Sequence, residues 1–415
     1  MQATPGDKLQ TYLESWTDRE ELAERIVPIT GALYRKHGVV ATVYGISLVH
    51  KNPIEIIKAH RYTRKLHGKV LPLAQSLAML ELLQQLSLAP ARINLGALFF
   101  GYQPDNHGSL EAYVRNELKD LINRPKPMRA KPQDVVLYGF GRIGRLMARI
   151  LIDKTGGGDK FRLRAIVTRP GKPGDLHKRA SLLRRDSVHG PFMGSITVDE
   201  DAHALVINGN VVHVIYSNAP EQVDYTAHGI DDAIVIDNTG RWRDREGLGK
   251  HLQANGVDRV ILTAPGKGDI PNIVYGVNHE TLAATEKIVS AASCTTNAIV
   301  PVLKAVHDRY GIASGHLETI HAYTNDQNLI DNFHPKARRG RGAPLNMVIT
   351  ETGAAKAVAK ALPELAGKLT GNAIRVPTPN VSLAVLNLQL DADITTENLN
   401  DFLREVSMDS PLHYQ

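Results

Sequence analysis

The sequence predicts an α/β protein in three parts: an all-helical N-terminal region, a domain with a largely parallel sheet, and an α+β domain. A chain of 415 residues is too long for one ordinary hydrophobic core. Up to residue 124, apolar residues recur with helical spacing. After residue 134, short β-branched runs alternate with segments long enough for helices, which is typical of a parallel sheet with crossover connections.

The N-terminal part, residues 1–124, is predicted to be helical throughout. The stretch Thr17–Glu20, TDRE, matches a capping box and predicts the start of a helix. Three apolar stripes have helical spacing: Leu22, Ile26, Ile29 and Leu33; Leu73, Leu77, Leu80 and Leu83; and Leu110, Val114, Leu118 and Leu121. No cluster of catalytic residue types occurs here, which favours a packed appendage. Residues 125–133 contain three prolines and are predicted to be a linker.

Seven short runs after the linker predict strands of a domain over residues 134–293. These runs are Val135–Tyr138, Arg164–Val167, Ala204–Ile207, Val211–Ile215, Ala233–Asp237, Val260–Thr263 and Ile288–Ser290. A helix over Thr295–Tyr310 and longer strands and loops follow. We therefore assign residues 294–415 to a separate mixed domain.

The composition narrows the classes of function. The hydrophobic share of 43% and the charged share of 22% are ordinary for a globular protein. No apolar run approaches the roughly 20 residues of a membrane span. A net charge of +6 favours a mildly basic enzyme, so we expect neither a nucleic acid nor a membrane as a partner. The single cysteine and the lack of a signal-peptide pattern predict a cytoplasmic location.

A glycine-rich turn joins the first strand of the second domain to a helix. Gly139, Gly141 and Gly144 form a G-x-G-x-x-G motif between these two elements. The first glycine permits a tight turn, the second lets the backbone approach a pyrophosphate, and the third lets the helix pack against the strand. In this setting the motif favours a Rossmann-type dinucleotide-binding domain over a turn without a ligand.

The end of the second strand bears on the choice of cofactor. An acidic residue is expected there to bind the ribose hydroxyls of NAD, but Thr168 and Arg169 stand in its place. A missing carboxylate removes repulsion against a 2′-phosphate, and an arginine can pair with it. This favours NADP, or the use of both cofactors. The alternative, that Arg169 points into solvent and decides nothing, stays open.

The only cysteine of the chain, Cys294, lies between hydroxyl residues at a predicted helix start. A helix N-terminus favours negative charge, and the thiolate is the nucleophilic form of cysteine. His321 follows a plausible strand over His316–Ile320 and could lie beside this cysteine as a base. The alternative is an inert buried thiol, against which the polar neighbours argue.

These motifs resemble those of phosphorylating glyceraldehyde-3-phosphate dehydrogenases. The matching stretches include GFGRIGR at 139–145, AASCTTN at 291–297, HAYTNDQ at 321–327 and RRGRGA at 338–343. They keep the order of the family over residues 134–415, whereas the N-terminal region lies outside the resemblance. The resemblance implies phosphorylating oxidation of glyceraldehyde 3-phosphate to 1,3-bisphosphoglycerate through a cysteine thioester, with hydride transfer to NAD(P). It implies no metal.

The resemblance also implies roles for individual residues. Cys294 matches the nucleophile of the family and His321 its general base. The pyrophosphate turn corresponds to Gly139, Gly141, Arg142, Ile143 and Gly144, and Thr239 falls at a strand end that contacts the cofactor. Thr324 and Arg375 match the site for the phosphate of the substrate. The site for inorganic phosphate corresponds to Ser293, Thr295, Arg339, Thr352 and Gly353.

Two alternative functions stay open from the sequence. Erythrose 4-phosphate oxidation needs nearly the same site, and a non-catalytic NAD(P)-binding regulatory protein could keep the dinucleotide fold. The resemblance implies a homotetramer and leaves the metabolic direction, glycolysis or gluconeogenesis, undecided. It also implies that closing strands, a C-terminal helix and an asparagine that holds the nicotinamide follow the last residue. We therefore expect the sequence to be a truncated record of an active enzyme.

Overall fold

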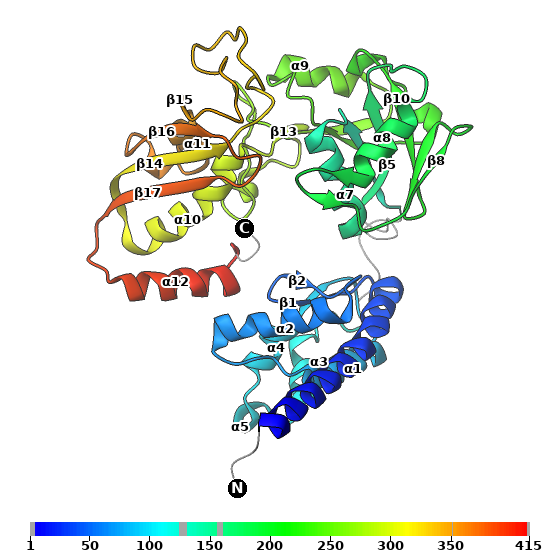
Figure 1. Ribbon diagram of the computed structural model, residues 1–415, viewed down its shortest axis with the longest axis vertical. Helices are drawn as coiled ribbons and strands as arrows, with labels where there is room; N and C mark the ends of the chain where they lie inside the picture. The colour runs from blue at the N-terminus through cyan, green and yellow to red at the C-terminus, as the bar shows by residue number, and fades with distance from the viewer. Residues whose placement is uncertain (1–4, 124–130, 156–160, 351, 413–415) are drawn as a thin grey trace. The chain divides into compact units, whose positions relative to one another are not determined.

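The chain divides near residue 130 into two compact units, which are described separately (Figure 1). The computed structural model describes residues 5–123, 131–155, 161–350 and 352–412. The predicted linker over 125–133 lies largely outside the described residues. The predicted fold class is confirmed for the parallel-sheet and mixed domains, with one correction in the N-terminal unit.

The N-terminal unit is mostly helical but also contains a small sheet. Its helices are α1 (Pro5–His37), α2 (Pro53–His67), α3 (Leu73–Gln85), α4 (Leu95–Gly101), α5 (Pro104–His107) and α6 (Leu110–Glu117). Its strands are β1 (Val40–Val43), β2 (Ile46–Ser47) and β3 (Arg92–Asn94), in the order β2-β1-β3. The prediction that this region is all-helical is therefore wrong in this respect.

The hairpin β1–β2 explains why helical spacing failed as a guide here. Tyr44 and Gly45 both have positive φ angles, 42° and 83°. Two such residues in succession give the turn type that joins two antiparallel strands tightly. Strand β3 then adds to β1 in parallel from about 50 residues farther along the chain, with Ile93 opposite Ala41. The spacing of apolar residues along a short segment cannot predict that β1 pairs with the distant strand β3.

The predicted helix start at Thr17 is also wrong. Helix α1 runs without interruption from Pro5 to His37, and the Thr17 hydroxyl donates to the carbonyl oxygen of Leu13, 3.0 Å away. A threonine inside a helix makes this bond to the preceding turn instead of capping. The apolar stripes themselves are confirmed, since Ile26, Leu80 and Val114 are fully buried in one core.

The second unit begins with a sheet of eight strands. They are β4 (Gln133–Tyr138), β5 (Phe161–Thr168), β8 (Ile196–Asp199), β9 (Ala204–Ile207), β10 (Asn210–Tyr216), β11 (Ala233–Asp237), β12 (Val257–Leu262) and β13 (Ile288–Ser290). The order is β13-β12-β11-β4-β5-β10-β9-β8, and only β9 and β8 run antiparallel to their neighbours. From β10 to β13 this is the strand order of a dinucleotide-binding domain.

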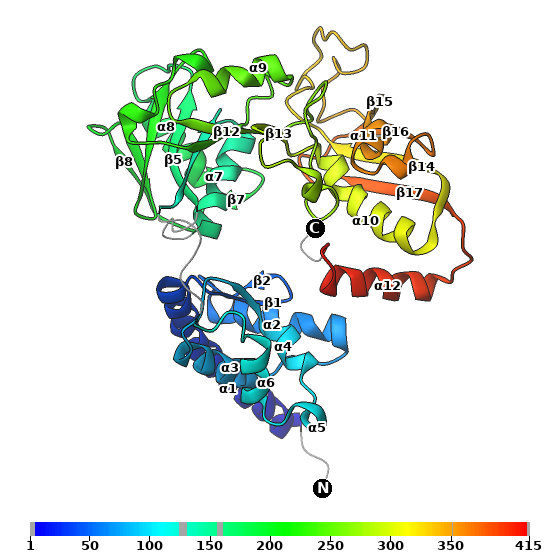
Figure 2. The ribbon, with the colours of Figure 1, turned by 180° about the vertical axis from the view of Figure 1, so that it is seen from behind.

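Helices and short turns cover both faces of this sheet (Figure 2). The elements are α7 (Arg142–Thr155), α8 (Asp175–Arg184), α9 (Arg245–Gly249), η1 (Pro220–Gln222), η2 (Thr226–His228), η3 (Lys250–Gln253), η4 (His279–Thr281) and the small pair β6 (Arg185–Asp186) and β7 (Gly190–Pro191). Alternate residues of one strand enter different cores: Leu137 packs with α7 and α8, whereas Val136 packs on the opposite face. The strands are apolar on both faces for this reason.

The mixed domain places helices against one four-stranded sheet. Its elements are α10 (Cys294–Tyr310), β14 (Ile312–Ala322), β15 (Val348–Thr350), α11 (Ala354–Ala361), η5 (Pro363–Leu365), β16 (Leu369–Val376), β17 (Leu383–Leu390) and α12 (Thr396–Asp409). The strand order is β15-β16-β14-β17, with β14 and β16 parallel. Leu303 of α10, Leu317 of β14 and Val358 of α11 share one buried core, which fixes the start of α10 beside the ends of the strands.

Candidate active site

The turn between β13 and α10, which leads to Cys294, contains a residue in a strained backbone conformation. Ala292 has a φ of 59°, a left-handed conformation that costs a residue with a side chain roughly 1–2 kcal/mol. Its N–H donates to the hydroxyl of the buried Ser290, 3.0 Å away. Asn297 fixes the turn from the other side, because its amide donates to the carbonyl oxygens of Ala291 and Ser293. Sequence reasoning assigned Asn297 no role.

Cys294 is exposed at the first helical position of α10. Ser293 is the N-cap, and its hydroxyl accepts the N–H of Thr296 at 3.0 Å. The remaining N–H groups of the first turn have no partner within the helix, so the helix start favours negative charge at this position. The Ser293 hydroxyl thus caps the helix and also lies 2.7 Å from the hydroxyl of Thr296.

His321 lies beside the same helical turn, as the sequence predicted. It is the penultimate residue of β14, and its Nε2 is 3.4 Å from the hydroxyl of Thr295. Burial lowers the pKa of His321 below its ordinary value, and the Arg375 guanidinium adds to the effect. The ring is therefore neutral near pH 7, the form that can accept a proton.

Arg375 is the neighbour of His321 across the parallel pair of β14 and β16. Its Nη1 donates to the carbonyl oxygen of Ala322 at 3.2 Å, but its buried Nε has no partner among the described residues. Burial and then Arg339 lower the pKa of Arg375, whereas Cys294 acts in the opposite direction. A buried donor without a partner and two repelling guanidinium groups together fit a site for an anion.

Arg339 is buried, and its guanidinium already has partners within the protein. Its Nε and Nη2 donate to the hydroxyl of Thr350, 3.2 and 3.0 Å away, and its Nη1 forms an ion pair with Asp326. Sequence reasoning missed both Thr350 and Asp326, although Asp326 stands inside the HAYTNDQ motif. A phosphate at Arg339 has to share or replace the Asp326 carboxylate.

Three other predicted phosphate ligands make no hydrogen bond to the two arginines among the residues that the structure describes. Thr324 is exposed, and its hydroxyl accepts the N–H of Asp326 at 3.4 Å. The Thr352 hydroxyl accepts the N–H of Ala354 at the start of α11, where Gly353 is the N-cap. Within the described parts of the chain, no hydrogen bond links Thr324, Thr352 or Gly353 to Arg339 or to Arg375.

The glycine turn after β4 has the geometry that a dinucleotide needs. Gly139 has a φ of 93°, and its N–H donates to the carbonyl oxygen of Val167 in β5. A Cβ on Gly144 would lie 2.2 Å from the Gly139 carbonyl oxygen, so only glycine allows this approach of α7 to the strand. Gly141, Arg142 and Ile143 are exposed, and a Cβ on Gly141 would enter open space.

Thr168 and Thr239 stand at neighbouring strand ends. Thr168 closes β5 and is 8% exposed, and its hydroxyl donates to the carbonyl oxygen of the exposed Arg169. Thr239 follows β11, and its N–H and hydroxyl both donate to Asp237 at 2.7 Å. Because β4, β5 and β11 are parallel, all three end at the same edge of the sheet as the glycine turn.

A buried hydrogen bond between Asp237 and His251 supports this edge. Asp237 is fully buried, and its second carboxylate oxygen lies 3.0 Å from Nε2 of His251, which is also buried. The pair anchors Thr239, whose methyl carbon would lie 2.8 Å from a Cβ on Gly139. Neither Asp237 nor His251 was singled out from the sequence. The exposed turn, the open space at Gly141 and this anchored strand end fit a nicotinamide dinucleotide.

The comparison with known families decides what this architecture belongs to. The NAD binding domain of glyceraldehyde 3-phosphate dehydrogenase matches residues 133–245, and the C-terminal domain of the same enzyme matches residues 293–413. The chain belongs to the glyceraldehyde-3-phosphate dehydrogenase family. The resemblance stated from the motifs is therefore confirmed, and so is a nicotinamide dinucleotide as the cofactor of its second unit.

Individual relatives of this glyceraldehyde-3-phosphate dehydrogenase family chain differ in how much of it they match. A glyceraldehyde-3-phosphate dehydrogenase-like protein of Pseudomonas aeruginosa is 57% identical over 94% of this chain and 85% of its own length. A glyceraldehyde-3-phosphate dehydrogenase of the same species is 45% identical over 67% of this chain and 80% of its own length. Chloroplastic glyceraldehyde-3-phosphate dehydrogenase A of Zea mays is 43% identical over 68% of each chain.

The extent of these matches separates the two units. Residues 131–415 are too few to make up 94% of the chain, so the first relative also matches most of the N-terminal unit. The other two matches have the size of the second unit alone. In the parts of the chain that the structure describes, no helix has the length and apolar character needed to cross a membrane.

Proposed function

We propose that this protein catalyses the phosphorylating oxidation of glyceraldehyde 3-phosphate to 1,3-bisphosphoglycerate with NAD(P). The observation that carries the proposal is the first turn of α10. There, Cys294 is exposed at a helix start and a neutral His321 lies against the next residue, Thr295. The half-buried Arg375 supplies the unpartnered Nε donor beside them. A nucleophile, a base and an anion site in one place suit a phosphorylated aldehyde.

The first half of the reaction uses the cysteine and the histidine. The Cys294 thiol adds across the aldehyde: sulfur bonds to carbon, and the proton ends on oxygen, which gives a hemithioacetal. The neutral His321 then accepts the hydroxyl proton as the carbon is oxidised to a thioester. The bound nicotinamide supplies the hydride acceptor for this oxidation.

The second half needs the anion sites. A phosphate oxygen attacks the thioester carbon, the carbon–sulfur bond breaks, and the Cys294 thiolate leaves as the acyl phosphate forms. Arg375 orients the phosphate of the substrate through its free Nε, and Arg339 holds the attacking phosphate after Asp326 yields its place. The Cys294 sulfur takes up the proton that the attacking hydrogen phosphate gives up, and the proton held by His321 passes to solvent, so the thiol and the neutral imidazole are both restored.

Initial rates of the full chain test this proposal. We expect turnover with glyceraldehyde 3-phosphate that depends on inorganic phosphate, and slower turnover with erythrose 4-phosphate. The assay is dinucleotide reduction followed at each aldehyde, with and without phosphate. Turnover that is unchanged without phosphate would contradict acyl-phosphate formation. Dinucleotide binding without any turnover would instead support the regulatory alternative.

We propose NADP, or both dinucleotides, as the cofactor. The support is the end of β5, where Thr168 is neutral and the exposed Arg169 follows it. Thr168→Asp places a carboxylate at this strand end, where it repels a 2′-phosphate. We expect the ratio of kcat/KM for NADP to that for NAD to fall about tenfold or more, which corresponds to about 1.4 kcal/mol.

Thr168→Asn is the matched control for this substitution, because it has nearly the same shape as aspartate without the charge. The expected change in the cofactor ratio is small for the asparagine variant and large for the aspartate variant. Equal shifts in the two variants would show that shape, and not charge, decides the preference.

We further propose a cytoplasmic homotetramer. Six large apolar side chains between β14 and β16 are exposed, among them Phe333 and Leu345 at 86% and 85%. The others are Leu329, Ile330, Met347 and Ile349. Monomers rarely expose so many apolar groups in one segment, which supports burial by another subunit.

The proposed cofactor also bears on the direction of the reaction. If NADPH is the working cofactor, the physiological direction is reduction.

A further inference from the structure

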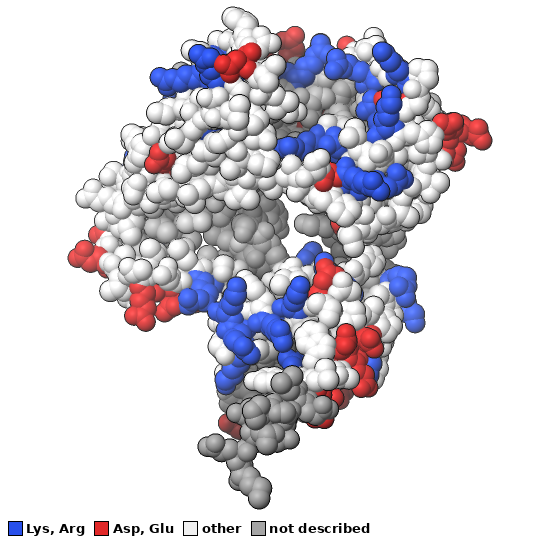
Figure 3. Space-filling model, viewed as in Figure 1, with Lys and Arg blue, Asp and Glu red and all other residues white. Residues whose placement is uncertain are grey.

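Helix α2 of the N-terminal unit carries a face of exposed basic residues. Lys58, Arg61, Arg64 and Lys65 lie on the helix, and Lys69 follows its last residue. We call these five residues the α2 basic face. Figure 3 shows lysine and arginine side chains gathered over this helix. The net charge of +6 over 415 residues gives no indication of such a local concentration of positive charge.

The α2 basic face has little acidic compensation in the described part of its unit. The one carboxylate on the helix, Glu55, forms an ion pair with Lys51, 2.8 Å away. In the described portion of the unit, none of the five basic residues takes part in an ion pair. Several of them stand three or four residues apart, where like charges destabilise a helix by a few tenths of a kcal/mol per pair. An external anion that binds this face would therefore reduce the repulsion between these charges.

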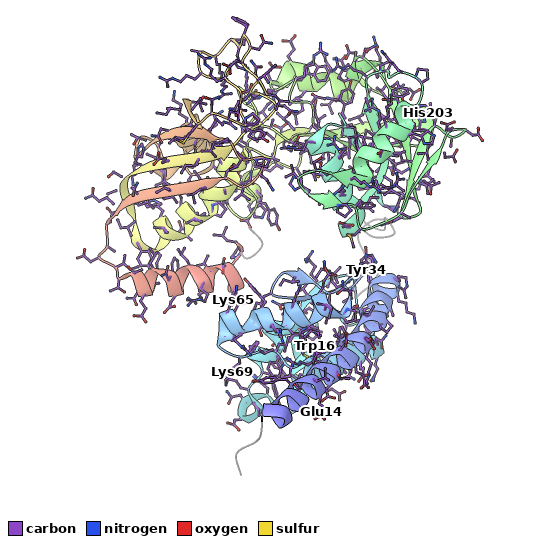
Figure 4. All side chains as sticks on the ribbon, in the orientation of Figure 1. Glu14, Trp16, Tyr34, Lys65, Lys69 and His203 are labelled. Atoms are coloured by element: carbon purple, nitrogen blue, oxygen red, sulfur yellow. The ribbon has the colours of Figure 1, made fainter. Side chains whose placement is uncertain are left out.

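Aromatic rings lie beside these charges. The Arg61 guanidinium is 5.8 Å from the centre of the Trp16 ring of α1, and Arg19 is 5.9 Å from the same ring. Tyr62 is 39% exposed on the neighbouring position of α2. Figure 4 shows Trp16 where α1 passes beside α2, with Lys65 and Lys69 toward the end of α2. Arginine and aromatic rings together form the kind of surface on which bases stack.

The spacing of the charges fits a repeating anion. Residues 58 to 65 span about 11 Å of helix axis at 1.5 Å per residue. Over that length one nucleic acid strand presents about three phosphates. Apart from Tyr62, this face of α2 exposes no large apolar side chain, whereas a helix that lies on a membrane needs an apolar face in the bilayer.

We propose that the α2 basic face binds single-stranded nucleic acid. Phosphates contact the lysine and arginine side chains, and bases stack near Trp16 and Tyr62. This interaction is separate from the proposed dehydrogenase reaction and revises the expectation of no nucleic acid partner. It gives the N-terminal unit a function that the second unit does not need for its chemistry.

The test measures binding of fluorescein-labelled twelve-nucleotide oligouridine to the full chain by anisotropy, with saturating NAD present. The variant R61E/K65E removes two positive charges from the face and adds two negative ones. The control K119E/R162E makes the same change in net charge at two exposed residues outside α2. We expect the dissociation constant of R61E/K65E to rise at least tenfold above that of the control.

The salt dependence gives a second readout. Each phosphate contact contributes about 0.7 to the slope of log affinity against log salt for single strands. The slope for R61E/K65E should therefore be smaller by about 1.4 than for the unaltered chain. R61A/K65A provides a milder pair in case charge reversal disturbs the fold, and circular dichroism monitors folding.

Four outcomes would overturn the proposal. Equal binding by R61E/K65E and the control would show that the face is not the site. Loss of binding on addition of NAD would place the oligonucleotide in the dinucleotide site. Equal affinity for a duplex of the same length would exclude base stacking. Binding to anionic phospholipid vesicles without binding to oligouridine would identify the face as a membrane-surface site.

Discussion

Cys294→Ser is expected to lower kcat with glyceraldehyde 3-phosphate by at least about 10³-fold, because a hydroxyl is a far weaker nucleophile than a thiolate near neutral pH. The whole proposed reaction passes through a bond to this sulfur, so no second residue can take over the step. A serine hydroxyl stays protonated near neutral pH, so its oxygen gains nothing from the position at the start of α10.

The fold should survive this substitution. Cys294 is exposed and makes no hydrogen bond that holds the turn; Ser293 and Asn297 do so instead. We expect the free energy of unfolding to change by less than about 0.5 kcal/mol. The measurements are steady-state kinetics, dinucleotide affinity, and intact mass after incubation with aldehyde and cofactor without phosphate. The unaltered chain should gain the mass of the acyl group, and the serine variant should not.

The variant Asn297→Ala distinguishes the role of Cys294 as nucleophile from the role of Asn297 in holding the turn. It removes both hydrogen bonds that the Asn297 side-chain amide donates to the turn but leaves the Cys294 sulfur in place. Acylation should persist at a reduced rate in this variant. If Cys294→Ser keeps turnover within tenfold of the unaltered chain, the cysteine is not the nucleophile and the proposed function is wrong.

Gly144→Ala is expected to have the largest effect on the dinucleotide-binding domain. The new Cβ would lie 2.2 Å from the carbonyl oxygen of Gly139 and 3.1 Å from its carbonyl carbon. Both are backbone atoms, so no side chain can rotate away, and α7 has to move off β4. We expect destabilisation by about 2–3 kcal/mol, the upper range for overpacking. Dinucleotide affinity should fall at least tenfold, because the helix start and the turn no longer meet.

Gly141→Ala is the matched control, because Gly141 and Gly144 belong to the same motif but have different surroundings. A Cβ at Gly141 meets nothing within 4 Å, so the free energy of unfolding should stay within about 0.5 kcal/mol of the original. Its dinucleotide affinity should still fall, since the Cβ enters the space that the pyrophosphate approaches. Thermal unfolding and equilibrium dinucleotide binding measure both quantities. Equal stability of the two variants would contradict the packing argument.

Most of the parallel-sheet domain could be predicted from the sequence. The strands Ala204–Ile207, Ala233–Asp237 and Ile288–Ser290 were located to the residue. The predicted run at Arg164–Val167 proved to be the centre of a longer strand, Phe161–Thr168. Such strands are short, apolar on both faces and separated by turn residues, so local composition identifies them. Their ends extend farther because pairing with a neighbour, and not local preference, determines where a ladder stops.

The supporting contacts of the candidate site could not be predicted in the same way. Asp326 binds Arg339 across 13 positions, and His251 binds Asp237 across 14. Nothing in the spacing of these residues distinguishes a buried partner from a solvated charge. The family resemblance implied a phosphate-binding role for Arg339, but it gave no indication that the guanidinium also binds a carboxylate and a hydroxyl in the fold.

From local patterns alone, the candidate catalytic and cofactor-binding residues and the parallel-sheet architecture around them could be predicted. A single cysteine at a helix start, a glycine motif between strand and helix, and alternating β-branched runs are local patterns, and local patterns follow from backbone sterics and periodicity. Only in the folded structure does it become clear that β1, β2 and β3 form a sheet inside a helical unit and that Arg339 is paired with Asp326. These properties depend on which distant segments meet, and burial energy summed over the whole chain selects those meetings.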